Sequence, residues 1–159
     1  MVRLSLPAAS ALLAALLLAS SAAADASSPT GENPGGTKCS LAGMWVNELG
    51  SRMVLSAPDD GGAFSGSYLS AVTASNAAIT ESPVLGVQHQ PDQSAQPTFS
   101  FVVLWRFTAS TAAFVGQCFV DEEGAETLET LWLLRQEVPA RGQDWQATRV
   151  GKNVFTRIK

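Results

Sequence analysis

Hydrophobic residues after Cys39 fall in short runs and recur at every second position, with turn residues between the runs. This spacing indicates β-strands with one buried face, whereas the apolar positions of a helix recur at every third or fourth residue. A helix of ordinary length is therefore hard to place. The pattern predicts eight strands: Gly43–Asn47, Met53–Ala57, Ala63–Leu69, Val84–Gln90, Thr98–Phe107, Thr111–Val120, Thr127–Arg135 and Gln146–Thr156.

Turn residues and prolines support these strand boundaries. The segments Asp59–Gly62 and Asp121–Gly124 have the composition of hairpin connections. Consecutive strands joined by short loops favour an antiparallel up-and-down meander, and eight such strands close into a barrel wide enough for one small ligand. We therefore predict an all-β fold, an eight-stranded antiparallel up-and-down β-barrel. Five prolines are expected between strands: Pro58, Pro83, Pro91, Pro97 and Pro139.

The inward face of the predicted barrel is partly polar. The parity that carries Trp45 also carries Asn47 and Ser51, and Tyr68 is in step with Ser70. Burying such groups without partners costs about 1–3 kcal/mol each. They are therefore expected to pair with one another and with ordered water, or with a polar ligand. The rest of the inward face is rich in aromatic residues: Phe99, Phe101, Trp105, Phe107, Phe114 and Trp132.

The outward face carries an apolar stripe. Val102 and Leu104 lie on the outward parity of one strand, and Leu131 and Leu133 lie on that of another. An exposed apolar stripe is explained by a subunit interface, or by a few scattered exposed residues that need no partner.

The first residues have the pattern of a secretory signal peptide. Arg3 precedes an apolar run, and the small residues Ala22–Ala24 mark a cleavage site, so residues 1–24 are assigned to the signal. Residues 25–38 are rich in Ser, Pro, Gly and Thr and are expected to form a flexible leader, with the folded domain at residues 39–159. No later run is apolar over a length that crosses a bilayer, so we expect a secreted, soluble protein without a membrane partner.

Charge and cysteine content narrow the functional classes further. The chain has two cysteines, Cys39 and Cys118, which are expected to form a disulfide in an oxidising compartment. Two cysteines and one histidine do not make a usual zinc site, so no metal is expected. The formal net charge is −4 and the acidic residues are scattered, which does not favour a nucleic-acid partner.

Six motifs then occur in one order along nearly the whole predicted domain: Cys39–Ser51, Gly66–Thr73, Gln96–Phe99, Gly116–Phe119, Thr130–Arg135 and Asp144–Asn153. Together they resemble the avidin and streptavidin family of biotin-binding proteins, on the animal avidin side. The resemblance implies a homotetramer of eight-stranded barrels, each binding one biotin non-covalently and with high affinity. It implies no catalysis and no cofactor, with biotin sequestered or carried outside the cell.

The resemblance also implies which residues contact each part of biotin. Donors to the ureido oxygen are Asn47, Ser51 and Tyr68, and acceptors for its two N–H groups are Asn153 and the hydroxyl of Ser70. The apolar wall around the ring and its chain consists of Trp105, Phe107, Phe114, Trp132 and Leu134. The group around the carboxylate consists of Val72, Thr73, Ala74, Ser75, Thr108 and Ser110.

Three more positions complete the predicted site. Leu49 is in step with the inward polar residues of the first run. Ala112 stands where the family offers a threonine hydroxyl near the biotin sulfur, and losing that weak hydrogen bond should cost about 0.5–1.5 kcal/mol. Trp145 resembles the tryptophan that each subunit lends to its neighbour's pocket.

Three other functions are alternatives to biotin binding. The segment Gly43–Trp45 also fits the short Gly-x-Trp signal of lipocalin-like carriers, but an apolar cargo would leave the inward polar groups poorly satisfied. An enzyme is not favoured, because His89 has no second histidine, free cysteine or pair of inward carboxylates beside it. A purely structural secreted protein is the third alternative.

Overall fold

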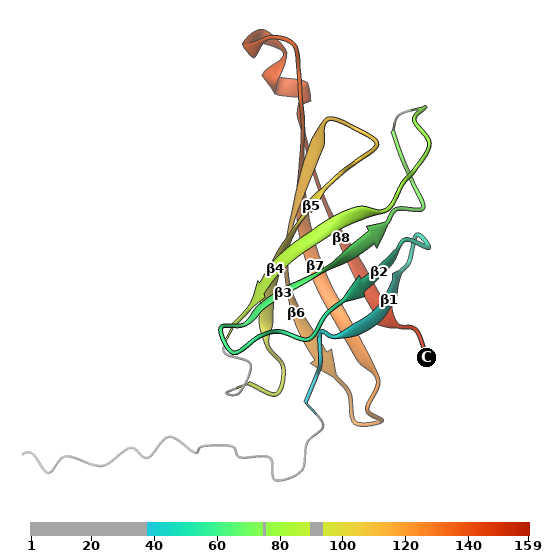
Figure 1. The fold of residues 1–159 in the computed structure, drawn as a ribbon, viewed down its shortest axis with the longest axis vertical. Helices are drawn as coiled ribbons and strands as arrows, with labels where there is room; N and C mark the ends of the chain where they lie inside the picture. The colour runs from blue at the N-terminus through green and yellow to red at the C-terminus, as the bar shows by residue number, and fades with distance from the viewer. Residues whose placement is uncertain (1–37, 75, 90–93) are drawn as a thin grey trace, which may run out of the picture. The chain divides into compact units, whose positions relative to one another are not determined.

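The computed structural model describes residues 38–74, 76–89 and 94–159, so the predicted signal peptide and all but the last residue of the leader lie outside it (Figure 1). Its elements in chain order are β1 Gly43–Asn47, β2 Arg52–Leu55, β3 Ala63–Leu69, β4 Ser82–Gln88, β5 Thr98–Leu104, β6 Ser110–Val120, β7 Glu126–Gln136, the 3-10 helix η1 Arg141–Gln146, and β8 Thr148–Arg157. No helix in these ranges has the length and apolar character needed to span a membrane.

The eight strands form a closed barrel in which each strand pairs antiparallel with the next in sequence. The barrel is closed by β1 and β8, which pair from Trp45 opposite Arg157 to Asn47 opposite Phe155. Closure satisfies the backbone groups that an open sheet would expose at its edges. The predicted eight-stranded antiparallel up-and-down barrel is confirmed.

Strand β5 ends at Leu104, so the prediction that it continues to Phe107 is wrong. The chain turns instead, because the Trp105 N–H donates to the Ser110 carbonyl at 3.3 Å and the Ser110 N–H donates to the Thr108 carbonyl at 2.8 Å. This turn places Phe107 and Thr108 in a loop between β5 and β6 rather than in the sheet.

The prediction that Pro83 lies between strands is also wrong, because β4 begins at Ser82. Pro83 pairs with Ser67 of β3, whereas the pairing of β4 with β5 begins only at Val84. A proline near the start of a strand, before the second neighbour joins, costs little because few ladder hydrogen bonds are at stake there.

The last strand begins at Thr148 rather than at the predicted Gln146, which belongs to η1. The helix ends where the Ala147 N–H donates to the Asp144 carbonyl at 3.0 Å. None of the residues of η1 is buried. Figure 1 shows η1 beyond the end of the strands β7 and β8 that it connects.

The bounds of β1 and β3 match the predicted ones, whereas most of the remaining strand ends differ by one or two residues. Strand β2 ends at Leu55, two residues before the predicted Ala57, and β4 ends at Gln88. Strands β6, β7 and β8 each extend slightly beyond the predicted C-terminal or N-terminal residue. Hydrogen bonding at strand ends is set by the neighbouring strand, which the sequence pattern of one strand does not contain.

The inside of the barrel is a continuous apolar core, which gives way to a partly polar section toward one end of the barrel. Trp45, Phe101 and Phe155 are among its largest fully buried side chains. The expected disulfide is present between Cys39 and Cys118, with a Cα–Cα distance of 5.8 Å and a sequence separation of 79. The disulfide links the segment before β1 to strand β6. Closing a loop of this length stabilises the folded state by about 4 to 5 kcal/mol in the chain-entropy description.

Arg157, the last residue of β8, links this strand to β7 and to the segment before β1. Its guanidinium donates to the Glu126 carboxylate and to the Ala42 carbonyl, the latter at 2.7 Å, and lies 4.1 Å from the ring centroid of Trp45. Glu126 in turn accepts the Ser40 N–H at 2.6 Å. Both charged side chains are largely buried, so each depends on the other for compensation.

Arg157→Met should destabilise the protein by about 2–3 kcal/mol, because it leaves a largely buried carboxylate without its partner. The melting temperature, measured by circular dichroism without ligand, should fall by roughly 10 °C. Arg135→Met is the control, since it breaks the exposed ion pair with Asp144, and such pairs contribute little. Equal melting temperatures for the two variants would refute the role given to Arg157.

Candidate functional site

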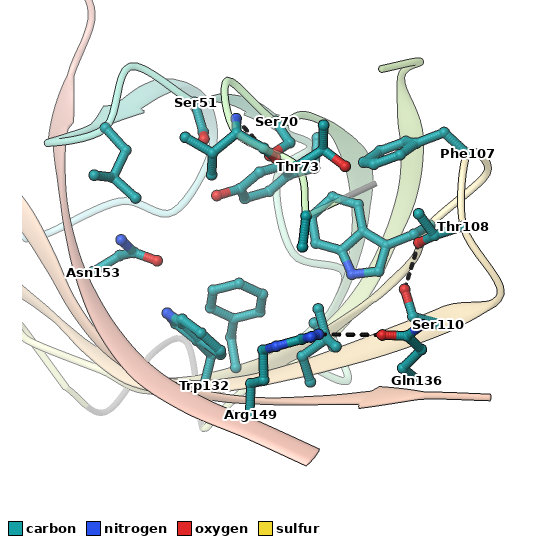
Figure 2. A pocket seen from close by; sticks show the side chains of 18 of the residues that line it. Ser51, Ser70, Thr73, Phe107, Thr108, Ser110, Trp132, Gln136, Arg149 and Asn153 are labelled. Atoms are coloured by element: carbon teal, nitrogen blue, oxygen red, sulfur yellow. Dashed lines mark hydrogen bonds between the residues drawn. The ribbon is translucent and has the colours of Figure 1, made fainter. Parts of the chain in front are cut away.

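The open end of the barrel contains a cavity of about 500 Å³ (Figure 2). This volume is in the range of small-molecule binding sites. The residues that line it are Asn47, Leu49, Ser51, Tyr68, Ser70, Val72, Thr73, Ala74, Trp105, Phe107, Thr108, Ser110, Ala112, Phe114, Trp132, Leu134, Gln136, Arg149 and Asn153. Thus every predicted site residue in the described ranges lines this one cavity, except Trp145. Ser75 lies outside the described residues.

Five aromatic side chains line the cavity: Tyr68, Trp105, Phe107, Phe114 and Trp132. The ring of Tyr68 packs edge-on against Trp105 at a centroid distance of 5.3 Å and lies 6.0 Å from Phe114. Trp105 packs against Phe107 at 5.6 Å. These contacts come from β3, β6 and the loop after β5, so the wall is held by the barrel itself. A ligand therefore meets a preformed surface.

The amide of Asn47 has a defined orientation at the end of β1. Its Oδ1 accepts the backbone N–H groups of Leu49 at 3.1 Å and Ser51 at 2.9 Å. The Nδ2 group is left on the cavity side, where its nearest partner is the Tyr68 hydroxyl at a long 3.4 Å. Because the oxygen is already engaged, Asn47 presents a donor to the cavity.

Ser51 and Tyr68 provide two further donors beside Asn47. The Ser51 hydroxyl oxygen accepts the Ala71 N–H at 3.0 Å, which leaves the hydroxyl proton to be donated. The pKa of Tyr68 is raised to about 12, mainly by burial; a hydrogen bond with Ser51 lowers it and the charge of Glu48 raises it, each by less than burial does. The phenol is therefore protonated at neutral pH and able to donate.

Asn153 and Ser70 present acceptors to the same cavity. The Asn153 Nδ2 group donates to the Glu48 carboxylate at 2.7 Å, and Figure 2 shows the amide oxygen turned toward the cavity. The Ser70 hydroxyl donates to the Val72 carbonyl at 2.6 Å and accepts the Val72 N–H at 3.2 Å. The hydroxyl proton is thus already donated within the protein, and only a lone pair of the oxygen remains to accept a hydrogen bond from a ligand.

Small hydroxyl side chains and one cation surround the mouth of the cavity. The hydroxyls of Thr108 and Ser110 lie 2.5 Å apart, and Thr73 also lines the cavity. Arg149 is the one charged side chain among the residues that line the cavity. Its guanidinium donates to the side-chain oxygen of Gln136 at 3.2 Å. An anionic end of a ligand is therefore favoured at the mouth over a cationic end.

Two lining residues, Gln136 and Arg149, were missed by the sequence reasoning. Strand parity contained the signal, because Gln136 is two residues beyond Leu134 and Arg149 is four residues before Asn153. The structure places Leu134 opposite Arg149 in the pairing of β7 with β8. Extending the inward parity to the ends of both strands would have identified them.

Two buried donors in the cavity wall have no partner among the described residues, the indole N–H groups of Trp105 and Trp132. A buried donor without an acceptor costs about 1–3 kcal/mol. Occupation of the cavity by solvent or by a polar ligand would reduce this cost. The aromatic walls thus include two indole N–H groups that can still donate a hydrogen bond.

Trp145 is placed differently from the other predicted site residues. It lies on η1, is 82% exposed, and does not line the cavity of its own barrel. A large exposed indole is unusual for a monomer, because tryptophan buries more apolar surface than most residues. The position is consistent with contact to another molecule.

The chain matches the avidin family over residues 35–158. It is 52% identical over 122 residues to avidin of Gallus gallus, covering 77% of this chain and 80% of that protein. It is 53% identical over 120 residues to avidin-related protein 1 of Gallus gallus, covering 76% and 79%. Among solved structures, a biotin binding protein from chicken aligns with a TM-score of 0.73 and 60% identity, covering 77% of this chain and 98% of that chain. Xenavidin aligns with a TM-score of 0.72 and 41% identity, covering 77% and 100%.

Proposed function

The chain belongs to the avidin family, and we propose that its barrel binds biotin with high affinity through the cavity described above. The observation that carries this proposal is the pattern of donors and acceptors in the cavity. Asn47, Ser51 and Tyr68 present three donors to the cavity, and Ser70 and Asn153 present two acceptors to it. The chain is a binding protein and not an enzyme.

A cyclic urea requires this pattern. Its carbonyl oxygen accepts hydrogen bonds and its two N–H groups donate them, all in one plane. The ureido group of biotin would place its oxygen toward Asn47, Ser51 and Tyr68 and its N–H groups toward Ser70 and Asn153. Every polar atom of the group would then be satisfied inside a largely dry cavity, where hydrogen bonds reinforce one another.

The rest of the ligand fits the rest of the cavity. The bicyclic ring would lie against Trp105, Phe114 and Trp132, and the carboxylate at the end of its chain would reach the hydroxyls at the mouth. Arg149 would favour that negative charge. Ala112 offers no hydroxyl, so affinity should be lower by about 0.5–1.5 kcal/mol than with a threonine there. Preformed walls reduce the ordering cost of binding.

The oligomeric state belongs to the same proposal. The outward side chains Leu131 and Leu133 are 68% and 47% exposed, and Val102 and Leu104 are exposed as well. An apolar stripe of this kind on the wall of a barrel is suited to packing against a second copy. We propose a homotetramer in which Trp145 of one subunit closes the cavity of its neighbour.

We also propose that the protein acts outside the cell. The composition of residues 1–24 fits a signal peptide, residues 25–38 a leader, and residues 39–159 the biotin-binding domain. The disulfide is compatible with an oxidising compartment. Such a protein would sequester or carry biotin without modifying it.

Calorimetric titration of the purified protein with biotin, and separately with retinol, tests the proposed ligand. Saturable binding of biotin at one molecule per chain is expected, with no saturable binding of retinol, because an apolar cargo leaves the inward polar groups unsatisfied. Binding of retinol without binding of biotin would favour the lipocalin-like carrier instead.

A further inference from the structure

Glu48 lies directly behind the cavity wall without lining the cavity. It follows β1, yet its carboxylate spans to β8: Oε1 accepts the Asn153 Nδ2 group at 2.7 Å, and Oε2 accepts the Val154 N–H at 3.0 Å. We propose that Glu48 is a positioning residue that fixes the orientation of the Asn153 amide for biotin. This inference rests on the proposed function, since it concerns the same cavity.

The orientation of Asn153 matters because an amide has nearly the same shape after a half-turn. The turn exchanges its oxygen with its NH2 group, so only hydrogen-bond partners decide which one faces the cavity. A carboxylate accepts but does not donate, so Glu48 binds the NH2 group alone. The oxygen is thereby directed into the cavity, where the side chain is only 6% exposed.

The second oxygen of Glu48 makes this arrangement rigid. Its hydrogen bond with the Val154 N–H ties the carboxylate to the backbone of the same strand that carries Asn153. The backbone carbonyl of Asn153 accepts the Thr130 hydroxyl at 2.8 Å. This bond fixes the backbone but leaves the side-chain amide free to turn. Among the hydrogen bonds of the described residues, the one with Glu48 is therefore the contact that orients the amide.

The charge state of Glu48 agrees with this role. Burial raises the pKa of its carboxyl, but hydrogen bonds from Asn153, its own backbone and Val154, together with the positive charge of Lys152, outweigh burial and lower the pKa. Tyr68 is neutral, because burial raises its pKa. The carboxyl is thus ionised, and accepts but does not donate, at neutral pH.

Glu48→Gln should reverse the orientation of the Asn153 amide, although the side chain at position 48 keeps nearly the same shape. With its oxygen kept on the Val154 N–H, the new amide presents an NH2 group to Asn153. Asn153 must then turn to accept it, and its own NH2 group faces the ureido N–H of biotin. Two donors oppose each other, so affinity for biotin should fall by about 10- to 100-fold.

The double variant Glu48→Gln with Asn153→Asp should restore binding. The new NH2 group at position 48 donates to the new carboxylate at position 153, whose second oxygen faces the cavity as an acceptor. Asn153→Asp alone places two carboxylates in contact, which then share a proton, so it should bind weakly. We expect the double variant to bind within about 10-fold of wild type and more tightly than either single variant.

Titration calorimetry with biotin at pH 7 measures the four proteins, with Glu122→Gln, an exposed change in the β6–β7 turn, as the control for lost charge. Melting temperatures establish that each variant is folded. Wild-type affinity for Glu48→Gln, or a double variant no tighter than the weaker single variant, would overturn the role of Glu48. Failure of the wild type itself to bind biotin would instead refute the proposed function.

Discussion

Asn47→Asp should weaken biotin binding by about 1000-fold or more at pH 7, the largest effect expected from one nearly isosteric change. One oxygen of the new carboxylate can still accept the N–H groups of Leu49 and Ser51, so the turn after β1 is retained. The other oxygen replaces the donor that faces the ureido oxygen. A lost donor is thus combined with a buried negative charge next to an acceptor.

Titration calorimetry against biotin measures this loss, and Gln96→Glu is a matched control. The oxygen of Gln96 also accepts a backbone N–H, from Val120 at 3.3 Å, but Gln96 is exposed and does not line the cavity. The control gains the same charge and should bind as wild type. Affinity of Asn47→Asp should partly recover as the pH falls and the new carboxyl gains a proton, since it can then donate. Tight binding by Asn47→Asp at neutral pH would show that Asn47 does not face the ureido oxygen.

Trp145→Lys should speed the dissociation of biotin by roughly 30-fold or more and shift the protein from tetramers to smaller species. A buried aromatic anchor at an interface is typically worth at least about 2 kcal/mol, and a lysine replaces it with a charge. In the isolated chain the indole is almost fully exposed, so the change should have little effect on the folding of one barrel. The measurements are the off-rate of labelled biotin and the mass in solution by light scattering.

Two variants make the Trp145 experiment specific. Trp145→Phe keeps an aromatic ring and should show a smaller increase in off-rate. Met44→Lys changes another exposed apolar residue, on β1 and away from the cavity, and should leave the off-rate unchanged. An off-rate for Trp145→Lys equal to that of wild type would refute the shared cavity.

Much of the barrel could be predicted because it depends on local pattern. Alternation of polar and apolar residues determines which side chains face inward, and this placed Asn47, Ser51 and Tyr68 inside before any ligand was considered. All three are buried in the structure. The apolar outward parity of Leu131 and Leu133 was found in the same way.

The features that the sequence did not yield depend on contacts between distant segments. The end of β5 is decided by the turn that joins Trp105 to Ser110, and Pro83 is tolerated because only one neighbour pairs with it. Glu48 and Asn153 are separated by 105 residues and meet only because β1 and β8 close the barrel. No periodicity in either segment indicates that pairing.

The central claim is that fixed donors and acceptors at the top of the barrel match a cyclic urea, and a crystal structure of the protein with biotin tests it directly. The ureido oxygen should lie about 2.7–3.2 Å from Asn47 Nδ2, Ser51 Oγ and Tyr68 Oη. The two N–H groups should donate to Asn153 Oδ1 and Ser70 Oγ. A complex in which biotin lies elsewhere, or in which these side chains turn toward bulk solvent, would contradict the account.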